Sequence, residues 1–141
     1  GEWQYAASYV DGTNWLSIDF ASGATADYSN TPATEAVAWY GDNSGSSTHD
    51  VGLKNANALG IYDMSGNVFE WCWDWYSDYD LDDRNNPKGP EKGKYTYRVL
   101  RGGSWDYDRG SARADSRSVS HPNYRFDSIG FRVVCSSPID R

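Results

Sequence analysis

The hydrophobic pattern of the chain is interrupted, because short apolar or alternating runs are separated by long polar stretches. Residues 68–75 alternate between aromatic or apolar and polar side chains, which predicts a strand. Residues 97–100 and 130–135 are shorter apolar runs and are predicted to be the last core strands. Residues 1–8 carry apolar side chains near helical spacing and are predicted to form the end of a helix.

Long polar segments connect these runs. Residues 11–34 are rich in Gly, Ser, Thr, Ala and Asn, and they are predicted to be an ordered loop. The apolar run 36–40 fits either a strand or a buried extended segment. Residues 76–94 form a charged excursion that contains Pro and Gly. Residues 106–128 are polar and lack apolar periodicity, and a loop of this length inside a compact domain is usually functional.

Composition narrows the classes of function. The 141 residues suit one modest domain or part of a larger one. The net charge of −7 gives no electrostatic footprint for nucleic acid and repels anionic lipid. No apolar run is long enough to cross a membrane. Aromatic residues make up 16% of the chain, so we expect the strands to be supported by Trp39, Trp71, Trp73, Trp75 and Trp105.

The cysteines and histidines give no sign of a reactive centre. Cys72 and Cys135 allow either two buried thiols or one internal disulfide. Neither has a His or Lys beside it in the sequence that would activate it as a nucleophile. His49 and His121 are far apart and lack ligands at zinc-site spacing, so we expect ordinary exposed histidines.

Four segments together resemble a known family, at residues 1–7, 55–75, 98–105 and 129–134. Their glycine and aromatic positions are similar to the formylglycine-generating-enzyme (sulfatase-modifying-factor) branch of the C-type lectin fold. The resemblance implies an α+β, loop-rich fold with short twisted antiparallel strands. It covers nearly all of residues 1–141 but corresponds to the C-terminal portion of a single family domain. We therefore expect the N-terminal portion of that domain to be missing from this chain.

The same resemblance argues against catalysis by this portion. Enzymes of the family bind copper through two cysteines in the loop that follows the Gly-Gly-Ser-aromatic motif. Here that loop has no cysteine, and Ala112 stands near where one is expected. Neither Ala nor Ser replaces a thiolate ligand of Cu(I). The sulfoxide-synthase relatives hold iron with histidines, and no histidine cluster occurs here. We expect no catalytic residue, with a metal-dependent oxidoreductase of either kind as the alternative.

Calcium is the one cofactor that the resemblance suggests. In related domains the turn at residues 65–70 can hold Ca²⁺ through backbone carbonyls and a carboxylate, which implies a structural site at Asn67, Val68 and Glu70. The other interpretation is that these polar side chains bond backbone groups of neighbouring loops. The run Asp78-x-Asp80-x-Asp82 imitates the start of a calcium loop but lacks the later Gly and Glu, so it predicts a solvated acidic loop.

The amino-acid alphabet of residues 106–128 is restricted. This segment contains no Trp, Gln, Met, Lys or Glu, the five residues that an NNC codon cannot encode. Diversity-generating retroelements randomise adenines, mostly in AAC codons, and produce this alphabet. The chain resembles the variable lipoproteins of spirochaetal systems of this kind. It matches their fixed frame at Gly102, Gly103, Ser104, Trp105, Arg113, Arg117, Pro122, Arg125, Ile129, Gly130, Phe131 and Arg132.

This resemblance implies a variable ligand-binding region at about residues 105–129. Arg113, Arg117 and Arg125 are expected to be scaffold residues, because guanidinium groups bridge loop carbonyls and carboxylates. The displayed residues are expected to be Asp106, Tyr107, Asp108, Ser111, Ser116, Ser118, Ser120, His121, Asn123, Tyr124, Phe126 and Asp127. Rigid aromatics mixed with small polar groups suit recognition. The other interpretation is an ordinary polar loop, or a scaffold subunit without a variable role.

The resemblance also predicts the setting. We expect a protein or another ligand on a surface as partner, and no nucleic acid. Contact with a membrane is expected only through an anchor outside this chain. An extracellular or cell-surface location follows from the same likeness.

Overall fold

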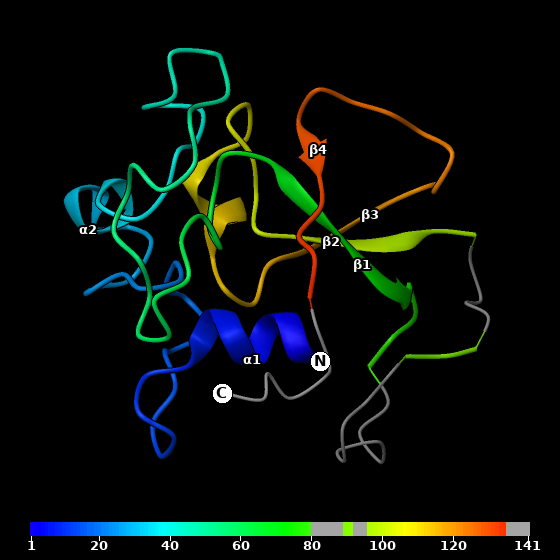
Figure 1. The fold of residues 1–141 in the computed structure, drawn as a ribbon, viewed down its shortest axis with the longest axis horizontal. Helices are drawn as coiled ribbons and strands as arrows, with labels where there is room; N and C mark the ends of the chain where they lie inside the picture. Colours follow the sequence, from blue (N-terminus) through cyan, green and yellow to red (C-terminus); the bar gives the residue numbers. More distant parts are fainter. Residues whose placement is uncertain (80–88, 92–95, 135–141) are drawn as a thin grey trace, which may run out of the picture.

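The computed structural model describes residues 1–79, 89–91 and 96–134. Its helices are α1 (Glu2–Ser8) and α2 (Thr31–Glu35), with a 3₁₀ helix, η1, at Arg109–Ala112. Its strands are β1 (Phe69–Trp75), β2 (Arg98–Arg101), β3 (Arg117–Ser120) and β4 (Ile129–Gly130). Irregular chain makes up most of the rest (Figure 1). The predicted loop-rich α+β fold is confirmed.

The four strands form one sheet in the order β3-β2-β1-β4. β1 pairs antiparallel with β2, with Glu70 opposite Arg101, and β2 pairs antiparallel with β3. β4 instead runs parallel to β1, with Phe69 opposite Ile129. The sheet is therefore mixed, and the pairing of β4 differs from the antiparallel strands that the resemblance implied. No helix in the described ranges is long and apolar enough to span a membrane.

Some predicted elements are confirmed and others were missed. The strands predicted at 68–75 and 97–100 are β1 and β2, and the helix predicted at 1–8 is α1. The last predicted strand pairs only at β4, and Cys135 lies outside the described residues. The segment 11–34 contains most of α2, although it was predicted to be loop. The Asn30 side chain caps α2 by accepting a hydrogen bond from the amide of Ala33 at 3.1 Å.

The core is made of small side chains more than of tryptophan. One cluster of buried residues comprises Ala21, Ala24, Val37, Ala38, Tyr40 and Ala112. A second comprises Ala7, Met64 and Ala114, with Trp3, Ala6 and Ile61 packed against it. The expected tryptophan support is wrong for Trp73, which is 84% exposed, and the other four predicted tryptophans are only partly buried. Since Ala112 and Ala114 belong to these clusters, the segment 106–128 is seated on the core.

The predicted extended segment 36–40 meets the turn before β1. Trp39 forms a parallel bridge with Gly66, and the Asn67 amide donates to the Trp39 carbonyl at 2.8 Å. Gly66 and Asn67 both have positive φ, of 77° and 64°. This backbone favours glycine, and asparagine tolerates it better than most residues. This turn directly precedes β1 and sets the direction in which the strand begins.

Candidate functional site

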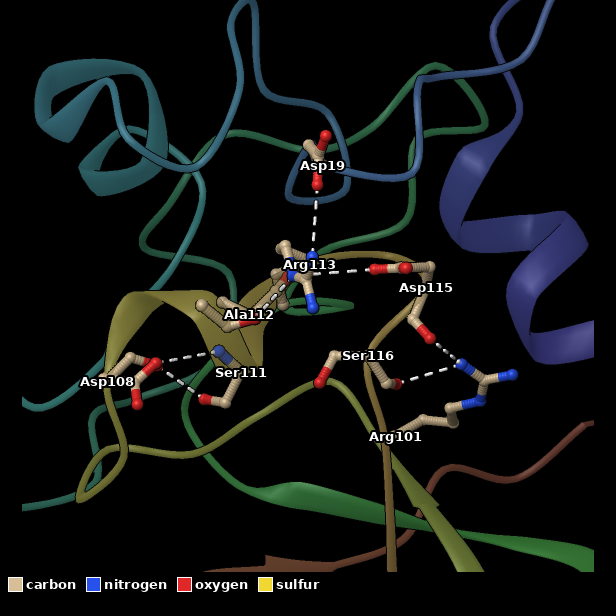
Figure 2. Close-up of polar contacts among 10 residues, drawn as sticks. Asp19, Arg101, Asp108, Ser111, Ala112, Arg113, Asp115 and Ser116 are labelled. Carbon is tan, nitrogen blue, oxygen red and sulfur yellow. Dashed lines mark hydrogen bonds and ion pairs between the residues drawn. The ribbon is translucent and has the colours of Figure 1, made fainter.

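Arg101 fixes the middle of the segment 106–128 to the sheet. Its side chain is buried, although guanidinium groups are usually exposed. It donates to the carbonyls of Asp115 and Ser116, each at 2.9 Å (Figure 2). It also donates to Gln4 Oε1 at 2.9 Å and to the Tyr79 hydroxyl at 3.2 Å. One arginine of β2 therefore joins the segment to α1.

Arg113 holds the segment from its other side. Its guanidinium donates to Asp19 at 3.1 Å, and its Nε donates to the Gly110 carbonyl at 3.0 Å. Asp115 lies 3.6 Å from the same Nε (Figure 2). The guanidinium also lies 5.3 Å from the centre of the Tyr28 ring. These contacts agree with the scaffold role that the sequence predicts for Arg113.

The other two predicted scaffold arginines differ from each other. Arg117 donates to the Ser77 carbonyl at 2.8 Å, and its guanidinium lies 4.1 Å from the centre of the Tyr79 ring. Arg125 is exposed. The contacts of Arg117 suit a scaffold residue, whereas Arg125 lies among the displayed side chains.

Three of the predicted ligand-binding residues, all near the start of the segment, use their side chains in local hydrogen bonds. Asp108 is the N-cap of η1, and its carboxylate accepts from the Ser111 amide at 3.2 Å. The Ser111 hydroxyl donates back to the Asp108 carbonyl at 2.6 Å (Figure 2). The Asp106 carboxylate accepts from the Ser104 hydroxyl at 2.6 Å. These side chains therefore stabilise the conformation of the loop in addition to being displayed on it.

The cap at Asp108 is expected to be measurable. Asp108→Ala should lower the free energy of unfolding by about 1 kcal/mol, because it leaves amide groups at the start of η1 without their side-chain acceptor. Asp127→Ala, which removes an exposed carboxylate from the same segment, should change it by less than about 0.5 kcal/mol. Denaturant midpoints of the two variants measure the difference. Equal midpoints would show that the capping bond contributes nothing to stability.

Apart from Tyr107, the remaining predicted residues lie further along the segment. Ser116 precedes β3, and Ser118 and Ser120 lie on it, all three partly buried. The connection from β3 to β4 carries the others, which are exposed except for the partly buried His121: Asn123, Tyr124, Phe126 and Asp127.

The predicted aromatic anchors do not all come together. The rings of His121 and Tyr124 are 5.5 Å apart, and those of Tyr124 and Phe126 are 6.0 Å apart. Tyr107 instead sets its ring edge-on to buried Phe69 at 5.0 Å. Tyr107, Tyr124 and Phe126 remain 49%, 59% and 54% exposed. The structure therefore places two anchors side by side and seats the third against β1.

The predicted calcium ligands have protein partners. The Glu70 carboxylate accepts from the guanidinium of Arg132 at 2.7 and 3.0 Å and from Trp3 Nε1 at 2.7 Å. Asn67 pairs both ways with the backbone of His49. Val68, which lies between Asn67 and Glu70 in the sequence, is partly buried. This donor set does not fit a calcium ion at Glu70 without displacement of Arg132, and structural Ca²⁺ here stays a prediction.

His49 is not the exposed residue that the sequence suggested. Its ring stacks on Trp39 at 3.8 Å, and its Nε2 lies 2.7 Å from the Ser44 carbonyl. The ammonium of Lys54 lies 3.7 Å from the centre of the same Trp39 ring. Burial lowers the pKa of Lys54. No motif or spacing in the sequence indicates this cluster, because Trp39, His49 and Lys54 come together only in the folded structure.

The described residues offer little for redox or nucleophilic chemistry. Ala112, which the family resemblance places near an expected cysteine position, is fully buried in η1. Cys72 is a free thiol, and burial raises its pKa to about 11, so it is protonated at neutral pH. Within the part of the chain that the structure describes, no three His, Cys, Asp or Glu side chains converge as a metal-binding group.

Comparison with known proteins identifies the family of the chain. The model of the sulfatase-modifying factor enzyme 1-like domain matches residues 1–137. Chaperone protein LppX of Paenibacillus barcinonensis is 34% identical over 146 residues, which covers 92% of this chain and 42% of LppX. The formylglycine-generating enzyme of Streptomyces coelicolor is 36% identical over 99 residues, which covers 67% of this chain and 30% of the enzyme.

Similar solved structures lead to the same family. Treponema denticola variable protein 1 superposes with a TM-score of 0.77 at 38% identity, covering 92% of this chain and 43% of that one. PvdO from Pseudomonas aeruginosa gives a TM-score of 0.65 at 28% identity, covering 92% and 48%. The chain thus spans less than half the length of these relatives, and the predicted likeness to a variable protein is confirmed. By fold, core and family match, the chain belongs to the sulfatase-modifying factor enzyme 1-like family.

Proposed function

We propose that this chain is part of a non-catalytic ligand-binding protein, with a sequence-diversified surface on a rigid C-type-lectin-like scaffold. One observation carries the proposal: fixed and displayed residues separate in space within the segment 106–128. Arg113 bonds to Asp19, and the side chains of Ala112 and Ala114 pack in the core. Tyr124, Phe126 and their neighbours in the β3–β4 connection are exposed.

The scaffold suits recognition because it is already ordered. Arg101 and Arg113 fix the segment through main-chain carbonyls, so these bonds do not depend on the identity of the displayed side chains. A pre-ordered loop loses less conformational entropy when a ligand binds. Tyrosine supplies large contact area with few rotatable bonds, and serine and asparagine adapt to polar partners. The likeness to Treponema denticola variable protein 1 supports the same function.

The second candidate is a metal-dependent oxidoreductase of the formylglycine-generating or sulfoxide-synthase kind. Identity with the formylglycine-generating enzyme of Streptomyces coelicolor favours it. The absence of cysteine from residues 106–128 argues against it, because copper chemistry of that kind needs thiolate ligands. Copper or iron bound to the full-length protein, with oxygen consumption on a thiol substrate, would favour this enzyme instead.

The proposal extends to partners and location. The ligand is a protein or another surface molecule, and the protein works outside the cell or on its surface. The N-terminal portion of the same domain completes the scaffold, and any membrane attachment comes from an anchor beyond this chain. Nucleic acid is not a partner, since the chain carries a charge of −7.

The gene itself provides the test. We expect an imperfect repeat of codons 100–135 downstream, differing from the gene mainly at adenines. Copies of the gene from one population should differ at the codons of Tyr124 and Phe126 and agree at those of Arg101, Ala112 and Arg113. Sequencing the locus and its flank measures both. A flank without a repeat, together with uniform copies, would rule out diversification and return the segment to an ordinary polar loop.

A further inference from the structure

We infer that Tyr97, which lies outside the predicted variable region, is a constant anchor of the ligand surface and contacts a folded protein ligand. The inference rests on the proposed function and deepens it, because it adds a fixed residue to a surface otherwise attributed to the segment 106–128. Affinity would then come partly from an unvarying ring, and selectivity from the residues beside it.

The sheet register brings Tyr97 to this surface. β2 and β3 pair antiparallel with Arg98 opposite Ser120, so the next position outward sets Tyr97 against His121. The two rings meet edge-on, with centres 6.5 Å apart and planes at 86°. Cross-strand aromatic pairs of this kind stabilise one another. A residue before β2 and a residue after β3 thus become neighbours.

From His121 the row of rings continues through the displayed loop. His121 contacts Tyr124, and Tyr124 contacts Phe126 edge-on at 86°. The row of Tyr97, His121, Tyr124 and Phe126 crosses two chain segments, yet Tyr97 is still 41% exposed. Its ring is therefore accessible to the same partner that contacts Tyr124 and Phe126.

The backbone of Tyr97 is held in place. Its carbonyl accepts from the Tyr76 amide at 2.8 Å, which joins the end of β2 to the chain after β1. The next residue, Arg98, lies with its guanidinium 3.8 Å from the centre of the Trp75 ring and donates to the Trp73 carbonyl. A tyrosine on such a support presents its ring at small entropic cost, as binding hot spots require.

The shape of the row favours a protein over a small molecule. Small ligands bind in concave sites that enclose most of their surface. A hollow of about 420 Å³ lies beside Trp75, Val99 and Arg101, and none of the four rings lines it. Exposed charges of both signs, Arg125 and Asp127, flank Phe126 in the sequence. Exposed aromatics with a mixed polar rim resemble the centre and edge of a protein interface.

The experiment uses a defined folded protein as probe. The full-length protein is displayed on phage with the twelve predicted ligand-binding positions randomised, and the library is selected for binding to hen lysozyme. In selected clones, Tyr97→Ala should weaken lysozyme binding by at least about ten-fold, and Tyr97→Phe should restore most of it. Tyr5→Ala is the matched control, because Tyr5 is 54% exposed and contacts the rings of Tyr9 and Trp15 at 6.0 Å.

The possible outcomes distinguish failure of this inference from failure of the proposed function. If clones bind lysozyme and tolerate Tyr97→Ala as well as Tyr5→Ala, the anchor is refuted while the binding surface stands. If no randomised clone binds above the parent, the proposed function fails and the inference fails with it. Hydrogen exchange of β2 and β3 in the Tyr97→Ala variant should match the parent, so a general unfolding would be detected and would also count against a direct contact.

Discussion

Replacing Arg101 with alanine should lower the free energy of unfolding by about 3–5 kcal/mol. The substitution removes a buried guanidinium and leaves the part-buried carbonyls of Asp115 and Ser116 without this donor, and a group left unsatisfied costs up to about 1–3 kcal/mol. It also removes the bond to Gln4 and the guanidinium that faces the Trp3 ring. Chemical denaturation followed by tryptophan fluorescence measures the loss.

Two variants make the Arg101 result specific. Arg101→Lys keeps the charge but offers one ammonium in place of a planar fork, so it should recover only part of the stability. Arg125→Ala removes an exposed arginine of the same segment and should shift stability by less than about 0.5 kcal/mol. If Arg101→Ala unfolds at the same denaturant concentration as Arg125→Ala, the central role of this residue is wrong.

Gly66→Ala should have an effect of similar size, for a different reason. A Cβ at Gly66 would collide with the backbone of Trp39, coming within 2.6 Å of its amide nitrogen. The φ of 77° adds about 1 kcal/mol of strain for any other residue. Because the Trp39 atoms that the Cβ would meet all belong to the backbone, the bridge between the two segments must open. We expect a loss above about 3 kcal/mol.

Gly45→Ala separates the two contributions. Gly45 also has positive φ, at 64°, but a Cβ there would meet nothing within 4 Å. It should therefore show the backbone strain alone, about 1 kcal/mol. Thermal melting of both variants gives the comparison. A Gly66→Ala melting point no lower than that of Gly45→Ala would mean that the turn before β1 relaxes freely.

The sequence predicts the elements that carry their own pattern. β1 was predictable because aromatic and polar residues alternate through it, and β2 because Val99 and Leu100 are apolar. β3 was not, since Arg-Ser-Val-Ser has only one apolar residue and becomes a strand by pairing with β2. Tertiary pairing of this kind overrides local propensity. α2 could have been found from Asn30 followed by Thr-Pro, a capping signal.

The site was predictable in outline but not in detail. The restricted alphabet marked residues 106–128, yet it could not show that Asp108 and Ser111 bond to each other. The partners of Arg101, which are Gln4 and the carbonyls of Asp115 and Ser116, lie on distant segments, and only the fold reveals them. Tyr97 was missed because its partner His121 is distant in sequence and becomes a neighbour only through the strand register.

The pairing of β3 with β2 has a consequence for how this surface can change over generations. It divides the segment 106–128 into two short spans, one held by Arg101 and Arg113 and the other returning to β4. Exchanges of side chain leave both spans at constant length and both ends in place. An insertion or deletion of one residue within β3 would instead shift the alternation of the strand and turn its serines to the opposite face. The proposed diversification would therefore change the side-chain chemistry of this surface widely while leaving its backbone shape nearly constant.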